Sequence, residues 1–348
     1  MKAHIIFTIT IFSFLKTLSQ DSTTKKKLQL HGFSELYYQI DFNRPANNER
    51  PPFFYHFRRN NKPAVNLILV NGSYQIRKAT VNIGLMTGDY AKYNLAAEPK
   101  WLRNIYQANF NYQLNAKWSL DVGILPSHIG LETAINKDGQ NLSRSIVAEN
   151  SPYYETGLKL NFSDQKKWTS AILLLNGWQN IKDQNNSKAL GTQIVFKPSK
   201  KWVLNSSGFI GNELPDSVAK SMRFFHDFYV QYFWSSKWNA VFILDAGFQG
   251  KNKWWGTAFI LQYEASSKIK SAIRTEYYND RNGVIVTAYP GKKFNAGVIS
   301  CNLDYLTSEF FTIRSELKHI CSGEFLFLRD GLQVKDNWSF LFSGTFFF

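Results

Sequence analysis

Apolar and polar residues alternate along most of the chain from residue 28 onward. Between residues 28 and 42 the even positions are mainly apolar and the odd positions mainly polar. The same alternation occurs at 106–114 and again at 255–264. A period of two residues indicates β-strands with one apolar and one polar face. The segments are about ten residues long, the length that a tilted strand needs to cross a bilayer.

Short polar phrases with a lysine recur between these segments, and a tryptophan follows four of them, as Trp118, Trp168, Trp202 and Trp238. If the phrases are hairpin turns, residues that face each other across a turn lie on the same face of the sheet. The expected pairs are Leu114 with Trp118, Trp234 with Trp238, Ala265 with Ile269, Phe162 with Trp168, Phe196 with Trp202, and Tyr305 with Phe311. Each pair keeps the apolar face continuous. We therefore predict one end of a membrane barrel, with the aromatic residues at the lipid headgroup level.

The connections at the other end of the expected hairpins are long, and only 250–253 is short. The strands are predicted at 28–42, 65–78, 79–91, 104–114, 118–125, 152–163, 168–177, 189–197, 202–211, 222–234, 238–250, 254–265, 269–279, 295–306, 310–322 and 337–348. Short turns at one end and long loops at the other are typical of outer-membrane barrels. The predicted fold is all-β, a transmembrane antiparallel up-and-down barrel of about 16 strands, with short periplasmic turns and long extracellular loops. A soluble β-sandwich is the alternative, but it does not need an aromatic residue beside nearly every turn at one end.

The N-terminus differs in character from the rest. Met1-Lys2 and the apolar run 5–15 are typical of a signal peptide, with Thr17 and Ser19 at the positions before a cleavage site. We predict a signal peptide at 1–19 and an outer-membrane barrel at 20–348; a buried first strand is the alternative for the apolar run. No later run of 18 apolar residues indicates a transmembrane helix. The chain ends on Phe348, an ending that barrel-assembly machinery recognises.

Seven longer phrases carry a family resemblance: DFNRPANNERPPFFY (41–55), GLMTGDYAKYNLAAEP (84–99), ILPSHIGLETAI (124–135), LSRSIVAENSPYYETGLKL (142–160), LLLNGWQ (173–179), SSGFIGNELPDS (206–217) and EYYNDRNGVIV (276–286). With them the chain resembles the putative β-barrel porin-2 family of Bacteroidota outer-membrane proteins over nearly its whole mature length. The resemblance implies a barrel of the porin type in the outer membrane. It does not identify the solute.

Segment 126–150 is the expected constriction loop. It joins the fifth and sixth predicted strands, the position at which general porins fold a loop into the lumen. It carries both signs of charge, in Glu132, Lys137, Asp138, Arg144 and Glu149. Mixed charge across a narrow pore orders water and selects ions. A solvated surface loop is the alternative.

Charged residues on the inward parity are the candidate pore lining: Arg274, Glu276, Arg314, Glu316 and Lys318. With a turn centred on Ser308, Asn302 should face Arg314. The alternative is a structural ion-pair network inside a plugged barrel.

The formal net charge is +15, of which Lys2 and Lys16 in the expected signal peptide contribute two. In a soluble protein this excess would suggest nucleic acid. Here many lysines fall in turns and loops, so outer-membrane lipid, lipopolysaccharide and an anion-leaning pore are the expected uses, and no nucleic-acid partner is expected.

Signals of catalysis are weak. His128 has no paired acid in the local sequence, and His226 falls on the lipid-facing parity. No metal, phosphate or dinucleotide motif is found, so neither an enzyme nor a cofactor is predicted. Two cysteines, Cys301 and Cys321, are too few for a disulfide framework.

The sequence thus predicts an outer-membrane porin, a passive diffusion channel for small hydrophilic solutes that is integral to the bacterial outer membrane. A homo-oligomer is compatible with it. The alternative is a loop-plugged barrel with a binding or structural role.

Overall fold

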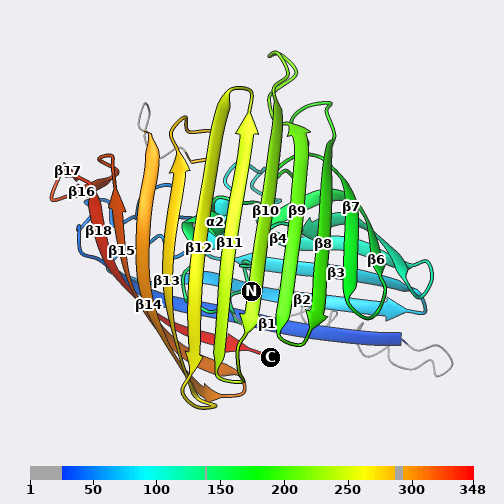
Figure 1. Cartoon of the computed structure of the whole chain (residues 1–348), viewed down its shortest axis with the longest axis horizontal. Helices are drawn as coiled ribbons and strands as arrows, with labels where there is room; N and C mark the ends of the chain where they lie inside the picture. Colours follow the sequence, from blue (N-terminus) through cyan, green and yellow to red (C-terminus); the bar gives the residue numbers. More distant parts are fainter. Residues whose placement is uncertain (1–25, 138, 287–292) are drawn as a thin grey trace, which may run out of the picture.

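The computed structural model describes residues 26–137, 139–286 and 293–348, so the predicted signal peptide lies outside the described residues. Sixteen antiparallel strands form a closed barrel, as predicted (Figure 1). They are β1 (Lys26–Asp41), β2 (Pro63–Ile76), β3 (Ala79–Thr87), β4 (Ile105–Gln113), β5 (Trp118–Pro126), β6 (Tyr154–Ser163), β7 (Trp168–Leu175), β8 (Ala189–Ser199), β9 (Trp202–Asn212), β10 (Met222–Phe233), β11 (Trp238–Gln249), β12 (Asn252–Glu264), β13 (Ile269–Asp280), β14 (Phe294–Ser308), β15 (Phe311–Ser322) and β18 (Asp336–Phe347).

Each barrel strand pairs with its neighbours in the sequence, and β1 pairs with β18 to close the ring. Closure leaves no strand edge without a partner, which a sheet in lipid requires. Two short strands, β16 (Phe327–Arg329) and β17 (Leu332–Val334), form a separate hairpin between β15 and β18. Figure 1 shows β8–β12 crossing β1–β4 at a steep angle, as the tilted strands on opposite sides of a barrel do.

The two faces of the barrel differ as the alternation predicts. Leu36, Ile83 and Phe259 point outward and are half exposed, whereas the residues next to them point into the barrel. Many of the inward residues are polar or charged and yet buried. The outer face is therefore suited to contact with lipid. Another part of the chain must fill some of the interior, because the inward polar side chains are buried.

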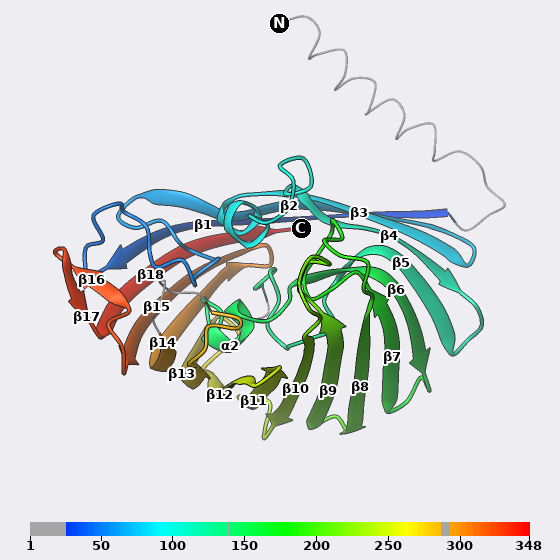
Figure 2. The same ribbon diagram turned by 90° about the horizontal axis from the view of Figure 1, so that it is seen from above.

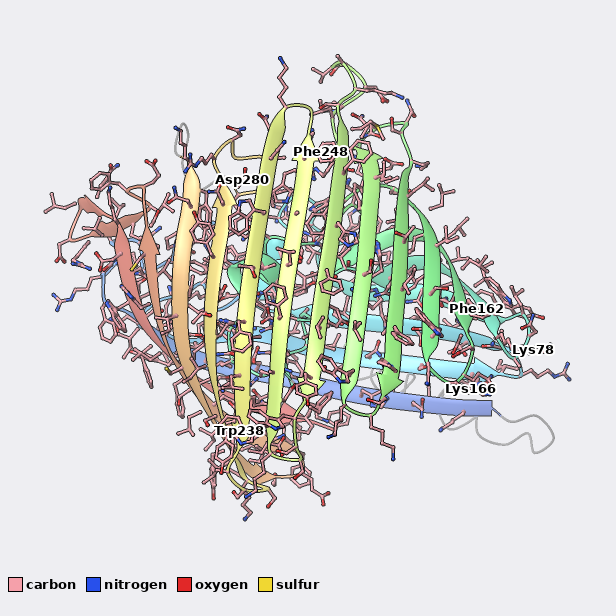
Figure 3. All side chains as sticks on the ribbon, in the orientation of Figure 1. Lys78, Phe162, Lys166, Trp238, Phe248 and Asp280 are labelled. Atoms are coloured by element: carbon pink, nitrogen blue, oxygen red, sulfur yellow. The ribbon has the colours of Figure 1, made fainter. Side chains whose placement is uncertain are left out.

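The tryptophans that follow short turns pack against an aromatic ring of the neighbouring hairpin, stacked for Trp168 and Trp202 and tilted for Trp118 and Trp238. Ring centroids lie 4.9 Å apart for Trp118 and Phe162, 3.9 Å for Trp168 and Phe196, 4.2 Å for Trp202 and Tyr232, and 4.6 Å for Trp238 and Tyr263. All four tryptophans are exposed on the outer face. Figure 3 shows Trp238 at the end of the barrel with the short turns, here called the turn end, and Phe248 toward the opposite loop end. The aromatic rings thus link successive hairpins just inside the turns.

Three of the six predicted turn registers are confirmed, and three are wrong by two residues. The backbone bonds from Leu114, Trp234 and Ala265 to Trp118, Trp238 and Ile269 agree with the prediction. In the other three hairpins, Phe162 lies opposite Ser170, Phe196 opposite Leu204, and Tyr305 opposite Ile313. A two-residue slip keeps every side chain on its own face, so the alternation cannot detect it.

The loop end carries longer connections, and two short helical turns in the described residues belong to these connections. These are the π-helical turn η1 (Tyr90–Asn94) and helix α2 (Ile146–Glu149), whose N-cap Ser145 accepts a hydrogen bond from the Ala148 amide. Figure 2, seen from above, shows α2 inside the ring of strands. Among the described residues no helix combines the length and apolar character needed to span a membrane.

Candidate functional site in the barrel lumen

The predicted charged ladder lies on β13 and β15 and points into the barrel. Its five side chains belong to residues that are at most 6 % exposed. They are buried because segment 126–150 folds into the lumen and packs against this wall, with α2 next to β12 and β13. The ladder and the predicted constriction loop therefore form one structure, here called the anchored loop.

Arg274 is the centre of this contact. Its guanidinium forms ion pairs with Glu276 at 2.7 Å, Glu316 at 3.1 Å and Glu132 of the loop at 3.3 Å. It also donates to the backbone oxygen of Ser143 at 2.7 Å. A buried arginine is costly unless its charge is paired, and here three carboxylates surround the Arg274 guanidinium.

The two ladder glutamates bind the backbone of the loop. Glu316 accepts from the Ser143 amide and Glu276 from the Ile146 amide, each at 2.5 Å. These bonds satisfy amides that would otherwise be buried without partners. These two glutamates thus bind the backbone of the loop, whereas Arg274 also contacts the side chains of Glu132 and Ser143.

Arg314 holds the tip of the loop. It pairs with Asp304 through two nitrogens, at 2.8 and 3.0 Å, and donates to the backbone oxygens of Asn136 and Gly139. The expected partner across the sheet was Asn302, which instead lies opposite Glu316, because this hairpin is one of the three with a shifted register. Lys318 completes the wall by donating to the Arg144 backbone oxygen at 3.2 Å.

The charged residues of the loop itself have different roles. Glu132 accepts from the Ser145 amide at 3.1 Å as well as pairing with Arg274. Arg144 is buried and donates to the backbone oxygens of Thr133 and Ala134, so it closes the loop on itself. Lys137 is exposed, with its ammonium 3.9 Å from the Phe347 ring centroid. Asp138 lies outside the described residues.

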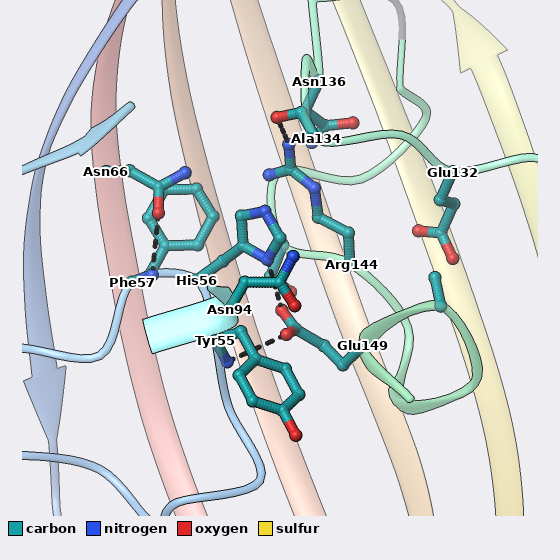
Figure 4. A network of polar contacts seen from close by, with 12 residues as sticks. Tyr55, His56, Phe57, Asn66, Asn94, Glu132, Ala134, Asn136, Arg144 and Glu149 are labelled. Atoms are coloured by element: carbon teal, nitrogen blue, oxygen red, sulfur yellow. Dashed lines mark hydrogen bonds and ion pairs between the residues drawn. The ribbon is translucent and has the colours of Figure 1, made fainter. Parts of the chain in front are cut away.

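Glu149 joins the anchored loop to segment 43–62, which connects β1 and β2. It accepts from the Tyr55 amide at 2.9 Å and contacts His56 Nδ1 at 3.0 Å (Figure 4). Burial lowers the pKa of His56 to about 4, and repulsion from Arg144 adds to this effect. His56 is therefore neutral near pH 7 and donates from Nδ1 to the carboxylate.

Sequence reasoning missed the acid that pairs with His128. The ring nitrogen Nδ1 lies 2.8 Å from Glu155, which is 27 residues away in the sequence, and Nε2 contacts the Gly208 backbone oxygen at 3.0 Å. Ser127 donates to the same glutamate and not to the histidine. Both nitrogens of His128 are occupied, so this group fixes the start of the loop and does not form a nucleophile–base pair.

No group of three or more His, Cys, Asp or Glu side chains among the described residues is placed to hold a metal ion. His226 lies on the outer face as predicted, and its nearest polar partner is Ser206 at 3.5 Å.

A family model described as "Putative beta-barrel porin-2, OmpL-like" matches residues 27–348. Comparison with curated protein sequences found no match.

Solved structures share the fold at low sequence identity. The outer membrane channel DcaP of Acinetobacter baumannii is 10 % identical with a TM-score of 0.63, and the match covers 93 % of this chain and 97 % of that one. An anion-selective porin from Comamonas acidovorans is 8 % identical, with a TM-score of 0.61 and coverage of 93 % and 100 %. OmpT of Vibrio cholerae, folded in vitro and in a trimer form, is 8 % identical, with a TM-score of 0.55 and coverage of 93 % and 99 %.

Proposed function

We propose that this chain, which belongs to the family described as "Putative beta-barrel porin-2, OmpL-like", is a diffusion channel narrowed by the anchored loop. It is an integral outer-membrane protein of the porin type, and small hydrophilic solutes pass through it passively. The observation that carries the proposal is the position of segment 126–150 inside the barrel, where Arg274 pairs with Glu132 and Arg314 donates to the loop backbone. A loop held in this way narrows the lumen but leaves a passage through the barrel.

Orientation and processing follow from the same proposal. The turn end faces the periplasm and the loop end faces outward, as in other outer-membrane barrels. Residues 1–19 are a signal peptide that is removed on export. Outer-membrane lipid and lipopolysaccharide surround the outer face, and barrel-assembly machinery inserts the chain.

Ion selectivity is expected to be weak. Arg274 and Arg314 are each neutralised by carboxylates, so the ladder offers little free positive charge. We assign any anion preference to Lys137 and Lys159, which are not part of the ladder. We also propose that the chain is not an enzyme, since His128 has both ring nitrogens occupied. Assembly into homo-oligomers is proposed by analogy with the trimer form of Vibrio cholerae OmpT.

One observation favours the loop-plugged alternative. At the loop end, Phe53 of segment 43–62 packs against Phe294 and Phe327, with ring centroids 5.0 and 6.1 Å apart, and all three are buried. Loops that share a core in this way could cover the lumen.

Swelling of proteoliposomes in isotonic solutions of neutral solutes of graded size distinguishes the two functions. A diffusion channel gives swelling rates that fall as the solute grows. A plugged barrel gives no swelling above that of empty liposomes with even the smallest solute.

A further inference from the structure

The lumen wall opposite the anchored loop is built from side-chain amides. On β3, β4, β6 and β8 the inward positions carry Asn82, Gln107, Asn109, Asn111, Asn161 and Gln193. We call these six residues the amide wall. Five of them are half-buried, whereas the ladder residues are fully covered by the loop. Apart from Gln193, which contacts the start of the loop at His128, the amide wall is therefore a part of the lumen that the loop leaves uncovered.

The amides are held in fixed positions. Asn111 and Asn161 both donate to Asp121, at 2.7 and 2.6 Å, and Asn82 donates to Asn109 at 2.8 Å. Gln193 donates to the His128 backbone oxygen at 2.7 Å. Groups that are fixed before a ligand arrives lose little entropy on binding it.

The wall still has hydrogen-bonding capacity toward the lumen. In the described part of the chain, the side-chain oxygens of Asn82, Asn111, Asn161 and Gln193 accept no hydrogen bond, and the amide groups of Asn82 and Asn111 each keep an N–H without an acceptor. The wall therefore offers donors and acceptors together. A hydroxyl group also donates and accepts, so it can pair with such an amide in either sense.

Charge on this wall is balanced. Asp121 and Lys159 lie directly opposite each other on β5 and β6 and are of opposite sign. An anion could accept hydrogen bonds only from the amide N–H groups, and a cation could bind only to the amide oxygens. Neither ion would be attracted by a net opposite charge on the wall. An uncharged polyol can use both kinds of group.

Space for a small solute lies beside the turn-end half of the wall. A cavity of 340 Å³ is lined by Asn161, Gln193, Ser119, Gln113 and Ser170, among others. That volume is at the small end of the range for ligand sites, and most of the residues that line the cavity are polar.

We infer that the amide wall is a binding track for uncharged polyhydroxylated solutes of saccharide type. The inference rests on the proposed function, because it names the class of solute that the channel favours. It assigns a role to the polar face of 106–114 that neither the ladder nor the anchored loop explains.

Current block in planar bilayers tests the inference, with maltose as the neutral probe and lactobionate as an anionic disaccharide of similar size. Maltose should reduce the ion current of the wild-type channel in a saturable manner, and lactobionate should do so more weakly. The double variant Asn111→Leu and Asn161→Leu should raise the half-blocking maltose concentration about ten-fold, since one or two lost hydrogen bonds account for that much. Thr275→Val, which changes a polar group on the outer face, is the control and should leave the block unchanged.

The outcomes separate the inference from the proposed function. The inference is overturned if the channel conducts but maltose does not block it in a saturable manner, or if lactobionate blocks it better than maltose. The proposed channel function stands in both cases. A folded wild-type barrel that carries no current overturns the channel, and titration calorimetry of maltose into the detergent-solubilised barrel then decides the inference. Maltose binding to the wild type that is lost in the double variant supports the inference. Absence of maltose binding to the wild type overturns the inference. Heat-modifiable migration in gels verifies that each variant is folded.

Discussion

At the scale of single residues, the aromatic rings near the turn end have a clear physical task. Trp118, Trp168, Trp202 and Trp238 are amphipathic, exposed on the outer face and packed against rings of the next hairpin. Such rings are most stable at the level of the lipid headgroups, where the indole N–H can meet water while the ring meets acyl chains. They therefore fix the depth of the barrel in the membrane.

We predict that the four tryptophans lie at one depth. Quenching of single-tryptophan variants by lipids brominated at different acyl positions should give the same shallow depth for all four. A tryptophan found in the middle of the bilayer, or protected from every brominated lipid, would show that the assigned outer face is wrong there.

The candidate site was only partly predictable at this scale. The alternation places Arg274, Glu276, Arg314, Glu316 and Lys318 on the inward face correctly, because the side-chain period of a strand is strictly two. Their partners were not predictable, since Ser143 and Gly139 reach the ladder only through the path of a long loop. The pairing of His128 with Glu155 was missed for the same reason.

At the scale of elements, strand bounds follow closely from the sequence, and registers do so less well. The bounds of the predicted and observed strands differ by a few residues at most, because polar turn sequences interrupt the alternation of apolar and polar residues. A shift of the register by two residues leaves every side chain on the same face of the sheet, and apolar residues still pair with apolar residues. Only the detailed geometry of the turn therefore fixes the register. The turn at 164–168 shows this: Asp164 accepts from the amides of Lys166, Lys167 and Trp168 and so tightens the hairpin.

The register of β14 and β15 predicts that Cys301 and Cys321 are free thiols. Leu317 lies opposite Cys301 and Gly297 opposite Cys321, so the cysteines are offset by four residues. The offset is about 13 Å at about 3.3 Å per residue, whereas a disulfide needs Cα atoms within about 7 Å. Both cysteines are exposed on the outer face and unpaired. Mass spectrometry after alkylation in denaturant without reductant should find two labelled cysteines per chain; a bridged peptide containing both would refute this register.

The contact of segment 43–62 with the anchored loop should depend on pH through His56. The folded-state pKa of His56 is about 4, below the unfolded value of 6.5, so between these values the undocked state binds more protons. Docking is therefore fully stable above pH 6.5 and weakens as the pH falls toward 4, by about 2 kcal/mol at pH 5.

Limited proteolysis measures this docking. Cleavage within 43–62 should become faster from pH 7 to pH 5 in the wild type, and His56→Phe should remove most of the change. The control His226→Phe alters a histidine on the outer face and should keep the wild-type dependence. Equal pH dependence in the wild type and in His56→Phe would contradict the role given to this residue.

At the scale of the whole molecule, the barrel and the anchored loop inside it are stabilised by different interactions. The barrel is held by a closed ladder of backbone hydrogen bonds. The anchored loop is held inside it by the ion pair of Arg274 with Glu132 and by hydrogen bonds from the ladder to the loop backbone. Removing an ion pair should therefore release the loop while the barrel stays folded. Breaking a buried pair costs about 3–5 kcal/mol, because the partner charges are left buried and uncompensated.

Single-channel conductance in planar bilayers tests this central claim most directly, with the wild type compared with Arg274→Met. Arg329→Met is the matched control, because it breaks an arginine–carboxylate pair whose side chains are 42 % exposed and which contributes little to stability. The wild type and the control should show the same discrete conductance steps, and Arg274→Met should show larger or fluctuating ones. A folded wild-type barrel without conductance, or identical steps in all three proteins, would contradict a channel narrowed by the anchored loop.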